Sequence, residues 1–397
     1  MALEFLDLIE TVRANDVSET RLYRGEGIRA RRKQVDTRYH EKFDEALALY
    51  SRVLAGDRWA ALTFQEALTT SDFPLLFGDI LDRALLGAYQ EAPYTWNMIA
   101  KAGSVADFRQ VKRFAIDGSE AVLPEVLQQA PYPGSSLSET RYLYSVSKHG
   151  RRIPFSWETM LNDDLDALKD IPNRYGKAAR RSEEKFVTQL FAGATGPDAT
   201  FFTVAHGNVI SPSVNSGVSD TNTALSIAGL QDAFIILASQ VDTEGEPIAI
   251  DGVTLVVPPA LEVTAQNLLN ATEILVGTFP TTGSNQQIRA VNWLAKRVKL
   301  AVNYYLPIVS PTNGNTSWYL FADPNAGRPA LEFGKLRGHE NPEIFIKTPN
   351  AQRVGGGMIN PLDGDFDTDS IEYKVRHCFG GTTMEVRMAV ASNGTGN

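Results

Sequence analysis

Residues 163–192 read DDLDALKDIPNRYGKAARRSEEKFVTQLFA, and this stretch predicts a long helix that is interrupted or begins at Pro172. One stripe runs along it at helical spacing, through Tyr175, Ala179, Ser182, Phe186 and Leu190. The charged residues fall mostly outside this stripe, at Arg180, Arg181, Glu183 and Glu184. We therefore expect a helix that packs one face on a core.

A long two-stranded arm is predicted before this helix, after a helical stretch at 75–89. Residues 111–117 have a strand pattern, and Tyr142, Tyr144 and Val146 alternate as a second strand should. The residues between them are too many for a tight hairpin and include Pro124, Pro131, Pro133 and Gly134. Such an arm has an irregular tip and buries little of itself, so we expect it to pack on something else.

The N-terminal part combines a helical pattern at 41–54 with a basic segment. Residues 21–42 hold eight Lys and Arg against three acids, a net charge of +5. The densest part contains Arg29, Arg31, Arg32 and Lys33. Two interpretations stand equally here: an arm that contacts nucleic acid or an acidic partner, or a solvated helix face with local salt bridges.

The middle of the chain is acidic. The whole chain has 38 Lys and Arg, 47 Asp and Glu, and a formal net charge of -9, yet residues 186–288 contain nine acids and no Lys or Arg. A polyanion-binding surface therefore cannot lie in this stretch. A loop at 193–222 is followed by a helical pattern through Ile227 and Leu237, a strand at 253–257 and a helix from Pro259. This alternation predicts a compact α/β subdomain.

The last third is mostly β. Strand patterns occur at 318–321, 343–347, 370–377 and 383–390. Between the last two lies Gly380-Gly381, a strong turn signal, so these two segments are predicted to form a hairpin. The end of the chain, 392–397, reads as a flexible tail.

Catalytic motifs are missing from the sequence: it has no phosphate-binding loop, dinucleotide-binding glycine motif, zinc-protease motif or nucleophile elbow. Four acids, Asp363, Asp365, Asp367 and Asp369, resemble a calcium loop but lack its Gly and Glu at the sixth and twelfth positions. We interpret them as solvated carboxylates where a strand begins, and leave open a weak cation site completed by neighbouring chains. We expect a structural protein rather than an enzyme, with no metal and no cofactor.

Cys378 is the single cysteine, which excludes an intrachain disulfide. The first ten residues carry acids and no basic n-region, so they do not predict a signal peptide. No apolar run approaches the ~18–20 residues that span a bilayer. We expect folding in a cytoplasm, with no membrane contact.

Several motifs in the C-terminal third carry a family resemblance: residues 317–324 (SWYLFADP), 328–333 (RPALEF), 335–345 (KLRGHENPEIF) and 369–377 (DSIEYKVRH). In combination they resemble the major head subunit of tailed bacteriophages, and most of all the family typified by the Mu-like prophage head subunit. The resemblance implies an α+β chain with the tailed-phage major capsid fold.

The implied domains follow the order found along the chain. They are an N-terminal helical and basic arm (1–70), an arm continuation with an extended two-stranded loop (71–155, the loop at 111–148), a peripheral domain with the long helix as its spine (156–204), an α/β axial domain (205–335) and C-terminal strands that return to the peripheral domain (336–397).

The implied function is assembly as hexamers and pentamers into an icosahedral head that encloses double-stranded DNA, formed in a bacterial host cytoplasm and located in the virion. The extended loop, with Lys112, Arg113, Pro124, Pro133 and Lys148, is expected to contact neighbouring subunits. The basic arm, with Arg24, Arg29, Arg31, Arg32 and Lys33, is expected to face packaged DNA or another subunit.

Further expected partners are a portal and scaffolding or decoration proteins. The acidic stretch is expected on the outside of the shell, since packaged DNA repels it. The alternative is an encapsulin-like nanocompartment shell that packages cargo proteins.

Overall fold

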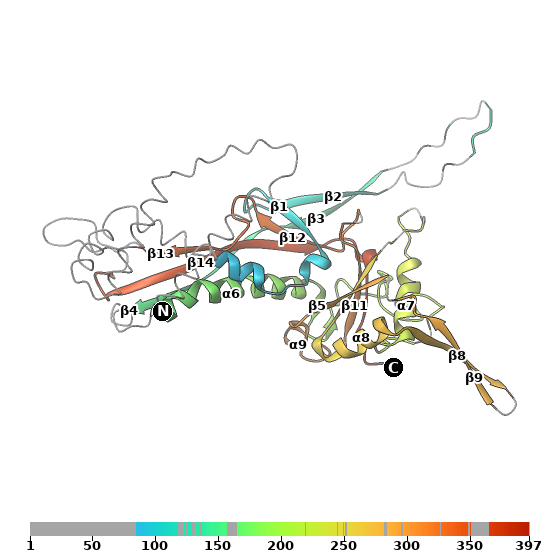
Figure 1. The fold of residues 1–397 in the computed structure, drawn as a ribbon. Coiled ribbons are helices and arrows are strands. Elements are labelled where there is room, and N and C mark those ends of the chain that lie inside the picture. The colour runs from blue at the N-terminus through green and yellow to red at the C-terminus, as the bar shows by residue number, and fades with distance from the viewer. Residues whose placement is uncertain are drawn as a thin grey trace, which may run out of the picture. The chain divides into compact units, whose positions relative to one another are not determined.

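The computed structural model describes residues 85–117, 123, 125–128, 132, 134, 137–156, 165–218, 220–243, 245–248, 250, 252–281, 284–294, 297–325, 327–347, 350 and 365–396 (Figure 1). The chain divides into two compact units. The larger contains Tyr89–His149, Lys177–Pro342 and His377–Asn397, and the smaller takes its described residues from 85–88, 150–176 and 343–376. The predicted segments at 21–42 and 41–54 lie outside the described residues.

The long helix is α6, Leu165–Phe191. Pro172 lies inside it and neither starts nor interrupts it, contrary to the prediction. The buried stripe is also rotated from the predicted one: Tyr175 and Ala179 are buried, but Ser182 is exposed. Other buried positions farther along the helix include charged and polar side chains: Arg180, Glu183, Glu184, Val187, Thr188 and Phe191.

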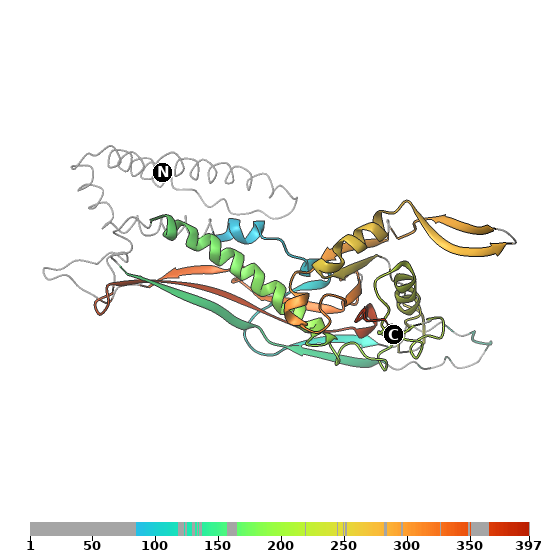
Figure 2. The same ribbon diagram turned by 90° about the horizontal axis from the view of Figure 1, so that it is seen from below.

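In the larger unit, α6 packs on a sheet. Strand β1 (Ala100–Val105) pairs in parallel with β12 (Leu331–Leu336), which pairs antiparallel with the end of β14 (Ser370–Thr383). Side chains alternate across this sheet. Phe333 and Phe379 contact Phe186 of α6, whereas Leu336 and Cys378 join a cluster on the opposite face. Figure 2 shows α6 running along these strands.

A second sheet in this unit has the order β10-β7-β11-β15 (Val298–Val302, Val253–Val257, Trp318–Ala322 and Ala389–Ser392). All residues of β7 and β11 are buried, so both faces of the sheet are covered. On one face, Val253, Leu255 and Val257 share a cluster with α7 (Ile227–Ala238) and α8 (Glu262–Asn270). The α/β character predicted for this part of the chain is confirmed.

Short elements complete the larger unit. They are the 3-10 helices η1 (Trp96–Met98), η2 (Pro259–Leu261) and η4 (Val386–Met388), the helix α9 (Leu306–Val309), and the strand pair β5 (Ala192–Gly193) and β6 (Gly196–Pro197). Strands β8 (Glu273–Thr281) and β9 (Ser284–Val291) pair only with each other among the described strands and form a projecting ribbon (Figures 1 and 2).

In the smaller unit, β13 (Glu343–Ile346) pairs antiparallel with residues 373–376 of β14. Its core contains Leu85, Ile171, Tyr175, Ile371, Tyr373 and Val375. Strand β4 (Ser147–Ser156) also pairs with β14. The strands predicted at 343–347 and 370–377 are therefore confirmed.

The predicted hairpin across Gly380-Gly381 is wrong. β14 continues through both glycines to Thr383, and residues 386–388 form η4 rather than a strand. These glycines serve close packing: a Cβ on Gly380 would collide with the carbonyl oxygen of Ser145, and one on Gly381 with that of Glu332. Glycine is needed here for close approach of backbones, the other common reason for glycine in a strand.

Helices and sheets occur together in both units, which confirms the α+β class. The domain boundaries placed at 70, 155, 204 and 335 stay predictions. Within the described part of the chain, no helix has the length and apolar character needed to cross a membrane.

The close approach at Gly380 gives a first test. We expect Gly380→Ala to destabilise the isolated subunit by about 1–3 kcal/mol, because the added methyl group forces Ser145 or the strand to move. The matched control is Gly87→Ala, in a helical segment where a Cβ meets nothing within 4 Å. That substitution should stabilise by about 0.5–1 kcal/mol. Urea unfolding followed by tryptophan fluorescence measures both; equal midpoints for G380A and the parent would contradict the packing role.

Candidate functional site

The predicted two-stranded arm is present in the larger unit. Strand β2 (Val111–Asp117) pairs antiparallel with β3 (Ser138–Tyr144), in a register that runs from Val111 opposite Tyr144 to Asp117 opposite Ser138. Neither strand pairs with any other described strand, and Figure 1 shows the ribbon leaving the sheet beside β1. A two-stranded ribbon alone is marginally stable in water, so its surface is the first candidate for a contact.

Apolar side chains of this arm are open to solvent. Phe114 and Ile116 are 57% and 60% exposed, and Leu123 and Tyr132 are 90% and 86% exposed. Leu127 and Leu137 are exposed as well. An exposed group of large apolar side chains marks a contact surface, because leaving it in water costs about 25 cal/mol for each Å² that could be buried.

The predicted loop residues have different positions. Lys112 is exposed and shares a strand face with Phe114 and Ile116, since alternate residues of a strand point to the same side. Lys148 is exposed on β4, outside the two arm strands. Pro124 and Pro133 lie outside the described residues, as do Arg24, Arg29, Arg31, Arg32 and Lys33 of the basic arm.

Arg113 points the other way and anchors the base of the arm. Its Nε donates to Oε1 of Glu332 on β12 at 2.8 Å, and the Tyr144 hydroxyl donates to the same oxygen at 2.6 Å. Glu332 is buried, and Gly103 and Gly334 leave the space that Glu332 and Tyr144 fill. Burial and the Glu332 carboxylate raise the pKa of Tyr144 to about 12, so its hydroxyl stays a donor. One carboxylate thus joins both arm strands to the sheet.

A second carboxylate lies on the other face of the sheet, in the core. Glu183 of α6 is fully buried, accepts hydrogen bonds from four side chains and forms an ion pair with a fifth. Oε1 accepts from the Tyr89 hydroxyl at 2.5 Å and from Nε2 of His377 at 2.7 Å, and Nζ of Lys335 lies 3.1 Å away. Oε2 accepts from Nε1 of Trp96 at 3.1 Å and from the Arg180 guanidinium at 3.0 Å. We call this set the Glu183 network.

The network keeps Glu183 ionised. Burial by itself raises the pKa of a carboxyl group, but the hydrogen bond from His377, the charge of Lys335 and the hydrogen bond from Tyr89 outweigh it and lower the pKa of Glu183 to about 2. Burial and the Glu183 charge raise the pKa of Tyr89, which therefore remains protonated. The arrangement is a buried ion pair cluster around an ionised carboxylate.

Arg180 and Glu184 extend the network to the segment before η1. The Arg180 guanidinium lies 3.7 Å from the Tyr89 ring centroid and 3.9 Å from that of Tyr94, a stacked cation between two aromatic rings. Glu184 accepts from the backbone N–H groups of Thr95 and Trp96 at 3.0 and 3.2 Å. The segment at 89–96 is thereby held on α6 by side chains that lie outside the stripe predicted from the sequence.

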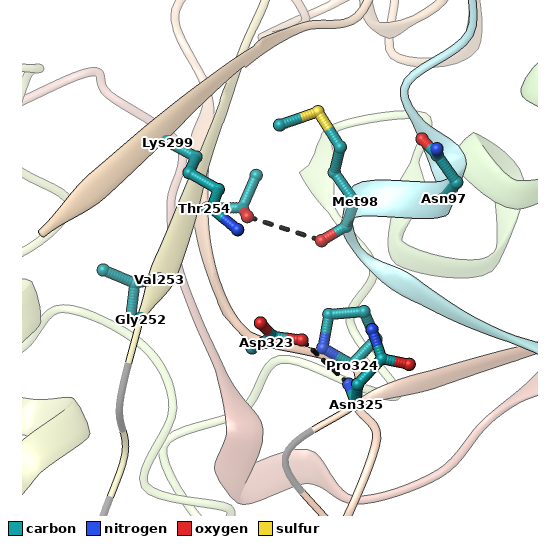
Figure 3. Close-up of a pocket in the computed structure, with 9 residues that line it drawn as sticks. All are labelled: Asn97, Met98, Gly252, Val253, Thr254, Lys299, Asp323, Pro324 and Asn325. Atoms are coloured by element: carbon teal, nitrogen blue, oxygen red, sulfur yellow. Dashed lines mark hydrogen bonds between the residues drawn. The ribbon is translucent and has the colours of Figure 1, made fainter.

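A small pocket in the larger unit carries no catalytic arrangement. It has a volume of about 170 Å³ and is lined by nine residues, shown in Figure 3: Asn97, Met98, Gly252, Val253, Thr254, Lys299, Asp323, Pro324 and Asn325. The Thr254 hydroxyl donates to the Met98 carbonyl, and Asp323 accepts from the Asn325 N–H. Pockets for drug-sized ligands usually have ~300–1,000 Å³, so this pocket is smaller than a typical ligand site.

The acids predicted to be solvated at 363–369 are only partly so. Asp363 lies outside the described residues, whereas Asp365 is buried and its Oδ2 is 2.6 Å from Nζ of Lys347. The hydrogen bond from Lys347 lowers the pKa of Asp365. Among the described residues, no three His, Cys, Asp or Glu side chains are grouped to hold a metal ion.

Comparison with known proteins decides the family. The sequence profile of a family described as "Phage capsid protein" matches residues 139–392, which is well over half of the chain. The chain belongs to this phage capsid protein family. The family predicted from the C-terminal motifs is confirmed at this level, and the finer Mu-like grouping stays a prediction. No curated protein sequence matches the chain.

Solved structures similar to this phage capsid protein include two viral capsids. The capsid of the cyanophage P-SCSP1u is 10% identical, with a TM-score of 0.43 over 76% of this chain and 88% of that one. The mature capsid of bacteriophage PhiM1 is 10% identical, with a TM-score of 0.43 over 75% of this chain and 86% of that one. A virus-like particle from Pyrococcus furiosus is 9% identical, with a TM-score of 0.40 over 80% of this chain and 99% of that one.

The Glu183 network predicts a pH-dependent stability. We expect Glu183→Gln to destabilise the subunit by about 3 kcal/mol at pH 7, because it leaves the buried Arg180 and the partly buried Lys335 without their anion. The folded pKa is depressed from 4.5 to about 2, so the wild-type advantage is full above pH 4.5 and is lost as the pH falls toward 2. Urea unfolding at several pH values measures this. The control Glu139→Gln, exposed on β3, should change neither the free energy of unfolding nor its pH dependence. If the stability difference between E183Q and wild type did not narrow below pH 4.5, the depressed pKa of Glu183 would be contradicted.

The arm base gives a separate test. Replacing Glu332 by Gln removes the charge that Arg113 and Tyr144 share, and we expect a local loss of about 1.5 kcal/mol. Amide hydrogen exchange at 111–115 and 140–144 should then become roughly tenfold faster. Lys112→Gln is the control: Lys112 lies on β2 next to Arg113 but points away from Glu332, so this change should leave exchange unchanged. Unchanged exchange in E332Q would show that the base is held by other contacts.

Proposed function

We propose that this chain is a major capsid subunit that assembles as hexamers and pentamers into an icosahedral phage head enclosing double-stranded DNA. Its family is that of phage capsid proteins, structural components of the virion. The observation that carries the finer proposal is the arm, whose apolar side chains are exposed and not covered by the residues that the structure describes. A neighbouring copy that receives the arm supplies that cover.

The geometry of such contacts favours closed rings. An arm that packs on a different patch of the next copy makes a heterologous interface, and heterologous interfaces close into rings when the rotation allows it. Contacts spread over several segments of each copy add avidity, so weak individual interfaces give a durable shell. The proposed role is structural and involves no catalysis. A portal, scaffolding or decoration proteins are further proposed partners, with assembly in the cytoplasm of the bacterial host.

The test is electron microscopy of the purified protein together with one arm variant. We expect closed polyhedral shells, or pentamers and hexamers, from the wild type. Phe114→Ser with Ile116→Ser should reduce assembly at least about tenfold without lowering the stability of the subunit, since both side chains are exposed there. Val263→Ser, at a side chain 68% exposed on α8, is the control and should assemble normally.

A wild-type protein that stays a monodisperse monomer would refute the proposal. Shells that contain protein cargo and no DNA would instead support the nanocompartment alternative. Normal assembly by the double variant would mean that the arm is not the contact that closes the shell.

A further inference from the structure

The solvent-exposed face of α6 in the larger unit carries a row of cations. Lys177, Arg181 and Lys185 are exposed and follow one another at four-residue intervals. They therefore lie on one side of the helix, about 6 Å apart along its axis. The other exposed residues between 177 and 191 are Ala178, Ser182 and Gln189, so this face has no acid. Both acids of this part, Glu183 and Glu184, are buried in the Glu183 network.

Such a row of like charges destabilises the helix that carries it. Like charges four residues apart on a helix repel one another, whereas an ordinary solvated face alternates acids and bases. None of the three cations forms an ion pair with any residue that the structure describes. Uncompensated repulsion of this kind indicates a surface that becomes neutralised when an external polyanion binds.

A DNA backbone fits this row better than an acidic protein surface does. Phosphates repeat regularly along a strand, and a straight row of cations at about 6 Å intervals places one cation near each of several phosphates. The acidic stretch of a second copy is the competing partner. Its acids are dispersed over separate loops and helices, and some are already engaged: Asp198 accepts from the N–H groups of Thr200 and Phe201, and Glu262 accepts from Gln266.

We propose that Lys177, Arg181 and Lys185 form a contact surface for the phosphate backbone of double-stranded DNA. The side of the sheet that carries α6 is then the DNA side of the subunit. The arm base lies on the opposite face, because Glu332 and Cys378 point there while Phe333 and Phe379 point to α6. The inference rests on the proposed function, since it names the surface of a shell subunit that meets the enclosed DNA.

The experiment compares two triple variants of the unassembled full chain. In K177Q/R181Q/K185Q the row is neutralised, and in K101Q/K148Q/K299Q three exposed lysines elsewhere are removed, so the net charge changes equally. Binding of a short duplex DNA is measured by fluorescence anisotropy at several salt concentrations. We expect the row variant to bind at least about tenfold more weakly at 0.1 M salt, with a salt slope lower by about 2 to 3 because three phosphate contacts are lost. The control should keep the wild-type slope.

A third variant separates binding from folding. Arg181→Glu places an acid between two lysines at four-residue spacing, which stabilises the helix. We expect an unchanged or higher melting temperature and weaker DNA binding.

Two outcomes would overturn the inference: row variants that bind DNA as the wild type does, or a control that loses as much binding as they do. Row variants that keep DNA binding but no longer assemble would assign the row to an acidic protein partner instead, and would also overturn it. Wild-type protein that forms no shells refutes the proposed function, which is a separate result.

Discussion

The buried carboxylate of Glu183 is the constraint on which the larger unit depends. Moving an ionised group out of water costs several kcal/mol, and only a full set of donors offsets that cost. Those donors come from segments far apart in the sequence: Tyr89 and Trp96 before β1, Lys335 on β12 and His377 on β14. Any alternative packing that separates one of them leaves a charge unpaired in the core. The network therefore favours one arrangement of these elements over others of similar apolar burial.

This arrangement fixes which side of each strand faces α6. Lys335 and His377 must point to Glu183, so Glu332 on β12 and Cys378 on β14 must point the other way, because side chains alternate along a strand. A shift of one residue in either strand would exchange the two sets. The same register that completes the core network thus delivers Glu332 to the arm base, where it meets Arg113 and Tyr144. The strand register therefore links the core to the arm base, although Glu183 and Glu332 interact with different side chains.

Sequence patterns predicted what depends on local chemistry. The strands at 111–117 and 253–257, the helix at 227–237 and the position of the arm follow from alternation, periodicity and turn residues, and the structure confirms them. The failures concern residues whose roles are set at long range. Arg180 and Glu183 are buried because partners about 90 residues or more away satisfy them, and hydrophobic patterning assigns such residues to solvent. Gly380-Gly381 follows turn chemistry locally, but its neighbours in space require a flat strand with no Cβ.

The positive charge on the exposed face of α6 follows from the burial of Glu183 and Glu184 on its other face. Between residues 177 and 191, α6 has two acids, Glu183 and Glu184, and both interact with buried donors from the segment at 89–96 or from the sheet. No acid between residues 177 and 191 then remains exposed to neutralise Lys177, Arg181 and Lys185. A helix whose acids were on the surface would pair them with these cations at four-residue spacing and present a neutral face. Because Glu183 and Glu184 hold the core, the part of α6 from 177 to 191 has an uncompensated basic face, and the ion pairs that stabilise the fold thereby generate the surface proposed to meet DNA.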